Sequence, residues 1–232
     1  MRTHSIQRIF RLLLCLVTSI TPALALASGD LSETEYAIRW DSREGGPGTA
    51  IDVLQWLGTS SKSAERYTVR YYDLPRPPSA PEGAAVILRQ RAKQGGKTQI
   101  RLKYRLDKPL TVDWACPSDD YEKSSEVDVA WLEHGQKVSY SYACTLSEEE
   151  APPAALKATP KPCVAEMTRY KADGFKIEEW LLPDGQRLLE ISRNAEDSVS
   201  KRQSFQVLVD QLIARGVSPA DRSKTELGSD CR

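Results

Sequence analysis

The sequence predicts an α+β fold that is mainly antiparallel β-sheet, with a short N-terminal helix and a longer C-terminal helix. The first observation is a series of segments in which apolar and polar residues alternate, the period of strands with one buried face. The second is that short turns containing Gly or Asp separate these segments, as in hairpins and meanders. A composition of 40% hydrophobic and 28% charged residues is typical of a globular chain.

Residues 1–27 have the features of a secretory signal peptide. A basic start without acidic residues precedes an apolar run too short to span a bilayer, and a small-x-small cleavage pattern follows. We therefore expect an exported protein, periplasmic or secreted, in which residues 28–232 form one domain with no membrane attachment; an uncleaved anchor is the alternative. These features are Arg2, Arg8 and Arg11, then Leu12–Ile20, then Ala25-Leu26-Ala27.

The net charge becomes informative once the signal peptide is set aside. The whole chain has 32 basic and 32 acidic residues. Cleavage after Ala27 removes three arginines and no acidic residue, which leaves 29 basic against 32 acidic residues and a net charge of −3. Since general nucleic-acid binders present excess positive charge, we expect no nucleic-acid partner.

Four cysteines remain after cleavage, and an even number in an exported chain indicates disulfides. Their wide spacing and the lack of a C-x-x-C pattern argue against a zinc site. Four cysteines allow three pairings. We favour Cys116 with Cys144, because these two flank one pair of expected strands, and Cys163 with Cys231.

The expected elements follow one another closely along the chain. Thr98–Arg105 alternates most regularly, and Gly95-Gly96 marks a hairpin turn between it and Val86–Lys93. A long helix is expected where apolar residues form one stripe and Gly216 follows as a stop. The other expected strands are Glu33–Asp41, Arg66–Asp73, Ser125–Trp131, Lys137–Cys144, Val164–Lys171, Phe175–Leu182 and Arg187–Arg193; the helices are Thr49–Leu57 and Ser198–Gly216, and Pro-rich loops lie at Leu74–Pro81 and near 151–162.

The charges are sorted by strand and by face. One face of the expected hairpin carries six cations, and same-face acidic pairs lie on other strands. In an open antiparallel sheet these charges would be solvated. In a closed barrel with polar faces inward, the acids would oppose the cations around a cavity suited to an anion and a hard divalent cation. The cations are Arg89, Arg91, Lys93, Arg101, Lys103 and Arg105, and the acidic pairs are Glu33/Glu35 and Glu126/Asp128.

Several short motifs, taken in order, resemble the CYTH superfamily, the triphosphate tunnel metalloenzymes. That family has an acidic E-x-E-x-K strand, an aromatic-Asp-Thr-Pro-like turn, basic L-R-x-R and L-T-L-K-like strands, and a closing E-x-E strand. The resemblance spans most of residues 33–193. The matching segments are Glu33-Thr34-Glu35, Tyr72-Asp73-Leu74-Pro75, Leu88-Arg89-Gln90-Arg91, Gln99-Ile100-Arg101-Leu102-Lys103, Arg169 and Leu189-Glu190-Ile191-Ser192.

The resemblance implies a closed β-tunnel that binds a linear polyphosphate or a nucleoside triphosphate, with Mg²⁺ or Mn²⁺ as cofactor. For an exported protein, inorganic polyphosphate is favoured over ATP as the anionic partner. Arg101 is added to the phosphate contacts only because it shares a face with Lys103, and Glu126 and Asp128 are possible further acidic lining. The implied phosphate contacts are Arg89, Arg91, Lys103 and Arg169, and the implied metal ligands are Glu33, Glu35 and Glu190.

Three departures from the family pattern weaken the expectation of catalysis. Ala37 stands at the lysine of E-x-E-x-K, Met167 where a second basic residue is expected, and Ser192 at the last acid of the closing E-x-E. Losing a carboxylate matters for Mg²⁺, which is bound through few carboxylates. The expected function is therefore binding of a phosphorylated anion, either by a metal-dependent phosphohydrolase or, alternatively, by a non-catalytic binding or scaffolding module with a degraded metal site. A lipocalin-like barrel with an apolar cavity is the third hypothesis, and it predicts outward-facing Arg89, Arg91 and Lys103.

Overall fold

The computed structural model describes residues 31, 33–61, 63–147 and 151–231, so the expected signal peptide lies outside the described residues. Strands dominate, and each expected strand is present. The strands are β1 (Thr34–Asp41), β2 (Ala64–Asp73), β3 (Ala85–Lys93), β4 (Thr98–Leu106), β5 (Glu122–Leu132), β6 (Gly135–Ser147), β7 (Thr159–Pro160), β8 (Ala165–Ala172), β9 (Phe175–Leu181) and β10 (Arg187–Ala195). The helices are α1 (Ala50–Trp56), α2 (Val199–Ile213) and α3 (Lys224–Gly228), with a 3-10 turn at Ala154–Leu156.

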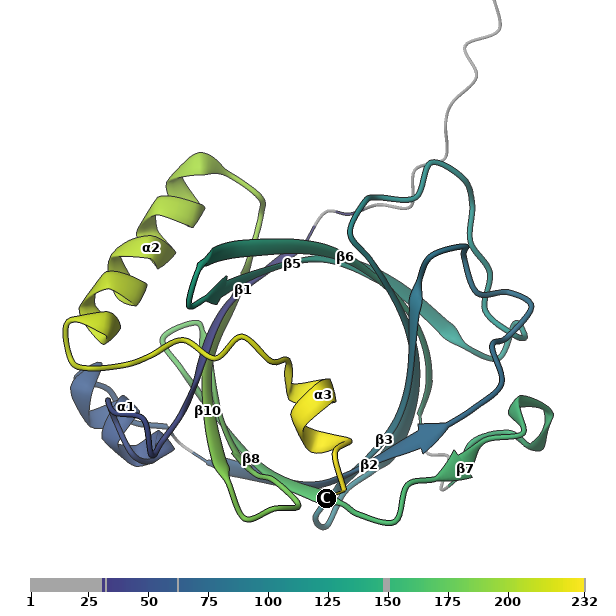
Figure 1. Cartoon of the computed structure of the whole chain (residues 1–232), viewed down its shortest axis with the longest axis horizontal. Helices are drawn as coiled ribbons and strands as arrows, with labels where there is room; N and C mark the ends of the chain where they lie inside the picture. Colours follow the sequence, from purple (N-terminus) through teal and green to yellow (C-terminus); the bar gives the residue numbers. More distant parts are fainter. Residues whose placement is uncertain (1–30, 32, 62, 148–150, 232) are drawn as a thin grey trace, which may run out of the picture.

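The sheet closes on itself. Its strand order is β3-β4-β6-β5-β1-β10-β9-β8-β2-β7, and β3 also pairs with β2, which completes the ring seen in Figure 1. The pairing is antiparallel except between β1 and β5, which are parallel. The closed, mainly antiparallel barrel is therefore confirmed, and the open sheet is excluded.

The outer face of the barrel is apolar on the side that carries the helices. Tyr36, Ile38 and Trp40 of β1 are at most 1% exposed and belong to one core with residues of α1 and α2. These helices lie outside the ring in Figure 1. Because alternate side chains of a strand point to opposite faces, burying this set outside turns Glu35, Ala37 and Arg39 inward.

Loops cover the outer face of β3, β4 and β6, and one disulfide fastens them. Leu88 of β3, Leu102 of β4 and Cys144 of β6 form a second core that is packed against the segments before β5 and after β6. Cys144 is bonded to Cys116, and Cys163 is bonded to Cys231 near the C-terminus. Both favoured cysteine pairings are confirmed.

A third apolar cluster lies inside the barrel, where α3 enters. It joins Met167 of β8, Trp180 of β9, Leu188 of β10 and Leu227 of α3. Figure 1 shows α3 within the outline of the strand ring. This five-residue helix was not expected from the sequence, and it closes part of the barrel interior. In the described residues, no helix has both the length and the apolar character needed to cross a bilayer.

Candidate functional site

A cavity of about 490 Å³ lies inside the barrel. Its walls are the inward-facing side chains of the strands, together with residues of α3 and of the segment before it. Arg89, Arg91 and Lys103 line it, so the hypothesis of a barrel with these side chains outside is wrong. The charged members of the lining include Arg89, Arg91, Arg101, Lys103, Arg105, Arg169, Lys176, Lys224, Glu35, Glu126, Asp128 and Glu178.

One wall of the cavity is strongly basic, because β3 and β4 pair with their cations on the same face. Arg89 lies directly opposite Arg101 in the register. Burial and the neighbouring charge of Arg89 lower the pKa of Arg91 to about 9. Burial, followed by Arg89, also lowers the pKa of Arg101. Each shift means that the charged form of an arginine is poorly compensated in the free protein.

Arg91 has no carboxylate partner among the described residues. Its guanidinium carbon lies 5.5 Å from the ring centre of Tyr67, and that of Arg169 lies 5.3 Å from the same ring. The nearby carboxylate of Glu178 is bonded instead to Arg169 and to Lys224. The Nε of Arg91 is buried and has no hydrogen-bond partner in the described structure.

The adjoining wall, from β4 to β5, is compensated. Lys103 Nζ lies 2.8 Å from Glu126 Oε1 and 3.4 Å from Asp128 Oδ2. Arg101 and Arg105 reach the same two carboxylates at 3.7 and 3.4 Å. Burial alone would raise the pKa of both carboxyl groups, but Lys103 and the arginines lower it. Glu126 and Asp128 therefore line the cavity as partners of its basic residues.

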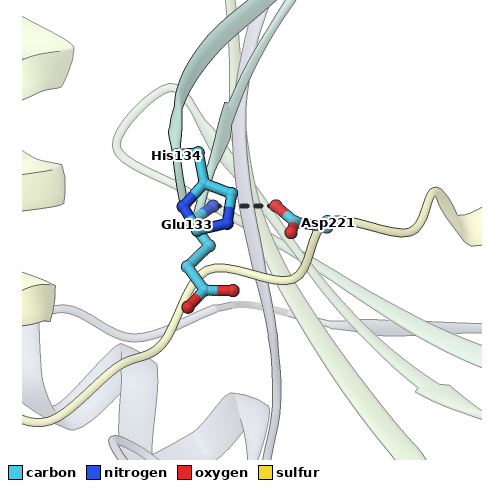
Figure 2. Close-up of side chains that lie close together, drawn as sticks. All are labelled: Glu133, His134 and Asp221. Atoms are coloured by element: carbon cyan, nitrogen blue, oxygen red, sulfur yellow. Dashed lines mark hydrogen bonds between the residues drawn. The ribbon is translucent and has the colours of Figure 1, made fainter.

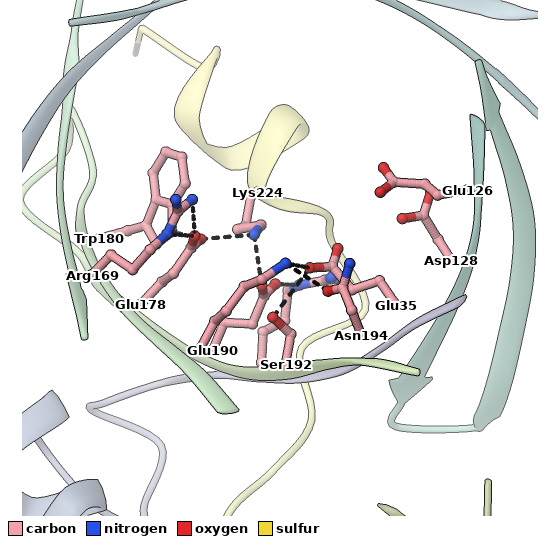
Figure 3. A network of polar contacts seen from close by, with 12 residues as sticks. Glu35, Glu126, Asp128, Arg169, Glu178, Trp180, Glu190, Ser192, Asn194 and Lys224 are labelled. Atoms are coloured by element: carbon pink, nitrogen blue, oxygen red, sulfur yellow. Dashed lines mark hydrogen bonds and ion pairs between the residues drawn. The ribbon is translucent and has the colours of Figure 1, made fainter. Parts of the chain in front are cut away.

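The opposite wall is acidic and equally well paired (Figure 3). Arg169 Nη2 lies 2.6 Å from Glu178 Oε1, and Arg39 Nε lies 3.1 Å from Glu190 Oε2. Lys224 of α3 contacts both carboxylates. Burial would raise the pKa of Glu178, yet Lys224 and the neighbouring arginines hold it well below the usual value.

The three carboxylates expected from the resemblance as metal ligands do not come together. Glu33 precedes β1, is exposed and does not line the cavity. Glu190 is 1% exposed and held by Lys224 and Arg39. Glu35 faces the cavity, accepts a hydrogen bond from Ser192 Oγ at 3.2 Å and lies 3.5 Å from Lys176 Nζ.

A different group of carboxylates gathers instead. Oxygens of Glu35, Glu126 and Asp128 lie within 4.8 Å of one another. Hard divalent cations are bound by such oxygens. Here, however, Lys103 already contacts Glu126 and Asp128, and Lys176 contacts Glu35. The donor set therefore does not fit a metal ion without displacing side-chain cations, and the expected Mg²⁺ or Mn²⁺ stays a prediction.

Each departure from the family pattern has a structural counterpart. Ala37 lines the cavity, and Arg39, two residues later, contacts Glu190. Met167 lies in the apolar cluster beside α3, where a charge would be poorly solvated. Ser192 donates a hydrogen bond to Glu35 rather than supplying a carboxylate.

Sequence reasoning missed Glu178 and Lys224. Glu178 could have been found from strand alternation, because it lies on the same face as Lys176 and directly opposite Arg169 in the register. Lys224 lies in a helix too short for a periodic signal. The only local signal is the capping box of Ser223 and Glu226, which is observed in the structure.

Two further features bear on where an anion would bind. Glu133 and His134 of the β5–β6 turn form an exposed cluster with Asp221, a residue of the segment before α3 that also lines the cavity, and the backbone N–H of Glu133 donates to Asp221 (Figure 2). A more open depression of about 700 Å³ lies between the segments near Ser118 and Ala155. No basic residue is among the described residues that line it, so the interior cavity is the candidate anion site.

Comparisons with known proteins leave the family open. No family model and no curated protein sequence matches this chain. Similar solved structures include the PH1012 protein of Pyrococcus horikoshii OT3 (16% identity, TM-score 0.47, covering 84% of this chain and 98% of that one). They also include a conserved hypothetical protein of Pyrococcus furiosus (15%, 0.46, 84% and 99%). A Vibrio parahaemolyticus protein described as a "putative adenylate cyclase" is similar at 11% identity (TM-score 0.48, 85% and 98%).

Proposed function

We propose that this protein is an exported barrel that binds a phosphorylated anion, such as tripolyphosphate or linear polyphosphate, inside its cavity. The observation that carries the proposal is the inward-facing pair Arg91 and Arg89, for which the described residues supply no ion-paired carboxylate. A cavity of about 490 Å³ is within the range of about 300–1,000 Å³ for small-molecule sites.

The chemistry of the arginine cluster favours phosphate over other anions. Guanidinium groups are charged at neutral pH and present several N–H donors in a plane, which matches the oxygens of a phosphate. Arg89, Arg91 and Arg101 lie on two adjacent strands, so several phosphate oxygens, or successive phosphates of a chain, can be contacted together. A bound anion would also relieve the repulsion between Arg89 and Arg91.

The proposed role is binding rather than hydrolysis. Metal-dependent cleavage needs carboxylates that are open to a metal ion. In the described cavity the acidic groups on the barrel strands are engaged by the chain's own cations, as in the contacts of Lys103 with Glu126 and of Lys224 with Glu178. A binding or scaffolding module on this barrel follows from that pairing.

The experiment is calorimetric titration of the full mature chain with tripolyphosphate. If Arg91 donates a charge-assisted hydrogen bond worth about 1.5–3 kcal/mol, then Arg91→Gln weakens affinity by roughly 10- to 150-fold. Arg66→Gln is the matched control, because Arg66 is exposed and on the outer face of neighbouring β2. Equal weakening by both substitutions, or none by Arg91→Gln, contradicts the proposal.

Hydrolysis and export are tested alongside. Release of inorganic phosphate from tripolyphosphate with Mg²⁺ or Mn²⁺, abolished by Glu126→Gln, would show the phosphohydrolase instead. The two disulfides fit an oxidising compartment outside the cytoplasm. N-terminal sequencing of protein recovered from the periplasm or medium checks cleavage after Ala27.

A further inference from the structure

The helix α3 brings a lysine to the acidic wall of the cavity. Lys224 is the first residue of α3, and its Nζ lies 2.8 Å from Glu178 Oε2 and 2.6 Å from Glu190 Oε1. The exposed fractions of these glutamates are only 3% and 1%. Figure 3 shows the lysine reaching from α3 to both carboxylates. One ammonium group therefore bridges two buried carboxylates.

The strand register makes a cation necessary at this point. Glu178 of β9 and Glu190 of β10 are directly opposite each other, so both side chains project from the same face of the sheet. Like charges in that arrangement repel, and burial strengthens the repulsion. Either a divalent metal ion or a side-chain cation can hold such a pair together.

The chain holds its own cation firmly in position. Ser223 and Glu226 form a capping box around the start of α3. Leu227 packs into the apolar cluster inside the barrel, and Cys231 is bonded to Cys163. The ammonium of Lys224 is thus delivered by an element anchored on both sides, and it does not depend on a mobile surface side chain.

The remaining oxygens of the pair are also occupied. Arg169 contacts Glu178 Oε1, and Arg39 contacts Glu190 Oε2. Two carboxylates therefore face three cations. Burial alone would lower the pKa of Lys224, but Glu178, Glu190 and the more distant Glu35 raise it, which keeps the lysine charged.

We infer that Lys224 is the resident cation of the Glu178–Glu190 pair, in the place of a divalent metal ion, and that the cavity takes its phosphorylated anion without added metal. The inference rests on the proposed function for the identity of the anion. It differs from the Mg²⁺ or Mn²⁺ expected by resemblance, because the side chains that would have to bind the ion are already paired.

The first test measures Mn²⁺ binding by electron paramagnetic resonance on the full mature chain without phosphate. We expect Glu190→Gln to leave Mn²⁺ binding of the wild type unchanged. Lys224→Ala should bind Mn²⁺ with at least tenfold higher affinity than the wild type does. Adding Glu190→Gln to this variant should remove the new site. Lys224→Arg, which keeps a cation, should behave as the wild type. Lys201→Ala is the control, since Lys201 is an exposed lysine on α2.

The second test does not require a destabilised variant. Wild-type protein is titrated with tripolyphosphate in the presence of a chelator and, separately, with Mg²⁺ present. The inference is supported if tripolyphosphate binds in the presence of the chelator and if Arg91→Gln weakens this binding.

Three results would overturn it. The first is tripolyphosphate binding by the wild type only when Mg²⁺ is present. The second is a wild-type Mn²⁺ site that Glu190→Gln abolishes. The third is a folded Lys224→Ala variant that gains no Mn²⁺ site. Failure of the proposed function gives a different result. If tripolyphosphate does not bind under either condition but Lys224→Ala gains a Mn²⁺ site, the proposed anion is wrong and the role of Lys224 as resident cation stands.

Discussion

Replacing Arg91 by methionine should make the free protein more stable and the anion complex weaker. Arg91 faces the cavity, has no described carboxylate partner, and carries a buried Nε without a hydrogen bond. Methionine reaches about as far as the arginine Nε and carries no charge, so it keeps the packing of the aliphatic stem and removes the repulsion from Arg89. The opposite signs of the two effects separate a functional cation from a structural one.

The size of the effect follows from the pKa. Lowering the pKa of Arg91 from 12.5 to about 9 corresponds to about 5 kcal/mol at ~1.4 kcal/mol per pH unit. This penalty is present wherever the folded protein keeps the arginine charged, which is below about pH 9, so it acts in full at pH 7. The variant loses the contact with Tyr67, worth about 0.5–2 kcal/mol, and solvent in the cavity screens part of the penalty.

The free energy of unfolding of the free protein should therefore rise by about 1–4 kcal/mol in Arg91→Met. This is in the range found when buried ion pairs are replaced by apolar groups. At roughly 2–4 °C per kcal/mol for a domain of this size, Tm should rise by at least about 2 °C. Thermal unfolding followed by circular dichroism measures this, with Arg66→Met as the exposed control. Calorimetry should show tripolyphosphate affinity at least tenfold weaker. A fall in Tm with unchanged affinity would refute the reasoning.

Three other predictions concern the same cavity and its closure. Tripolyphosphate affinity should weaken above about pH 9, as Arg91 loses its proton. Affinity should fall less steeply with pH in Arg91→Gln. The titration of tripolyphosphate itself is the same for both proteins and cancels in this comparison. Changing Cys163 and Cys231 together to serine should cost about 4 kcal/mol in chemical denaturation, because their disulfide closes a separation of 68 residues. Gly228→Ala should cost about 1–3 kcal/mol in the same assay, since its Cβ would lie 3.0 Å from the ring of Tyr71; no loss of stability would show that the ring moves freely.

The basic half of the candidate site was predictable from local pattern. β4 alternates regularly, so placing Leu102 and Tyr104 in a core also places Arg101 and Lys103 on the opposite face. The hairpin turn at Gly95 then sets β3 beside β4, which brings Arg89 opposite Arg101. The local pattern did not decide whether this basic face is exposed to solvent or lines the interior of a barrel.

The acidic half depended on contacts between distant segments. Glu190 was expected as a metal ligand, yet it is paired with Arg39 across a separation of 151 residues and with Lys224 of α3. Glu33 was grouped with Glu35 by spacing, but it lies just outside β1 and is exposed. Strand period assigns a side chain to a face and does not say which charges meet there.

The sequence by itself determined the strands, the presence of two disulfides and the presence of a basic face, because alternation, turn chemistry and an even number of cysteines are local or countable properties; which of the three cysteine pairings forms was decided by the fold. Closure of the sheet by β3 and β2, and the approach of α3 to the acidic wall, were decided only by the tertiary structure. The physical reason is that Lys224 is drawn to its place by two carboxylates more than thirty residues away, whose repulsion arises only once β9 and β10 are paired in register.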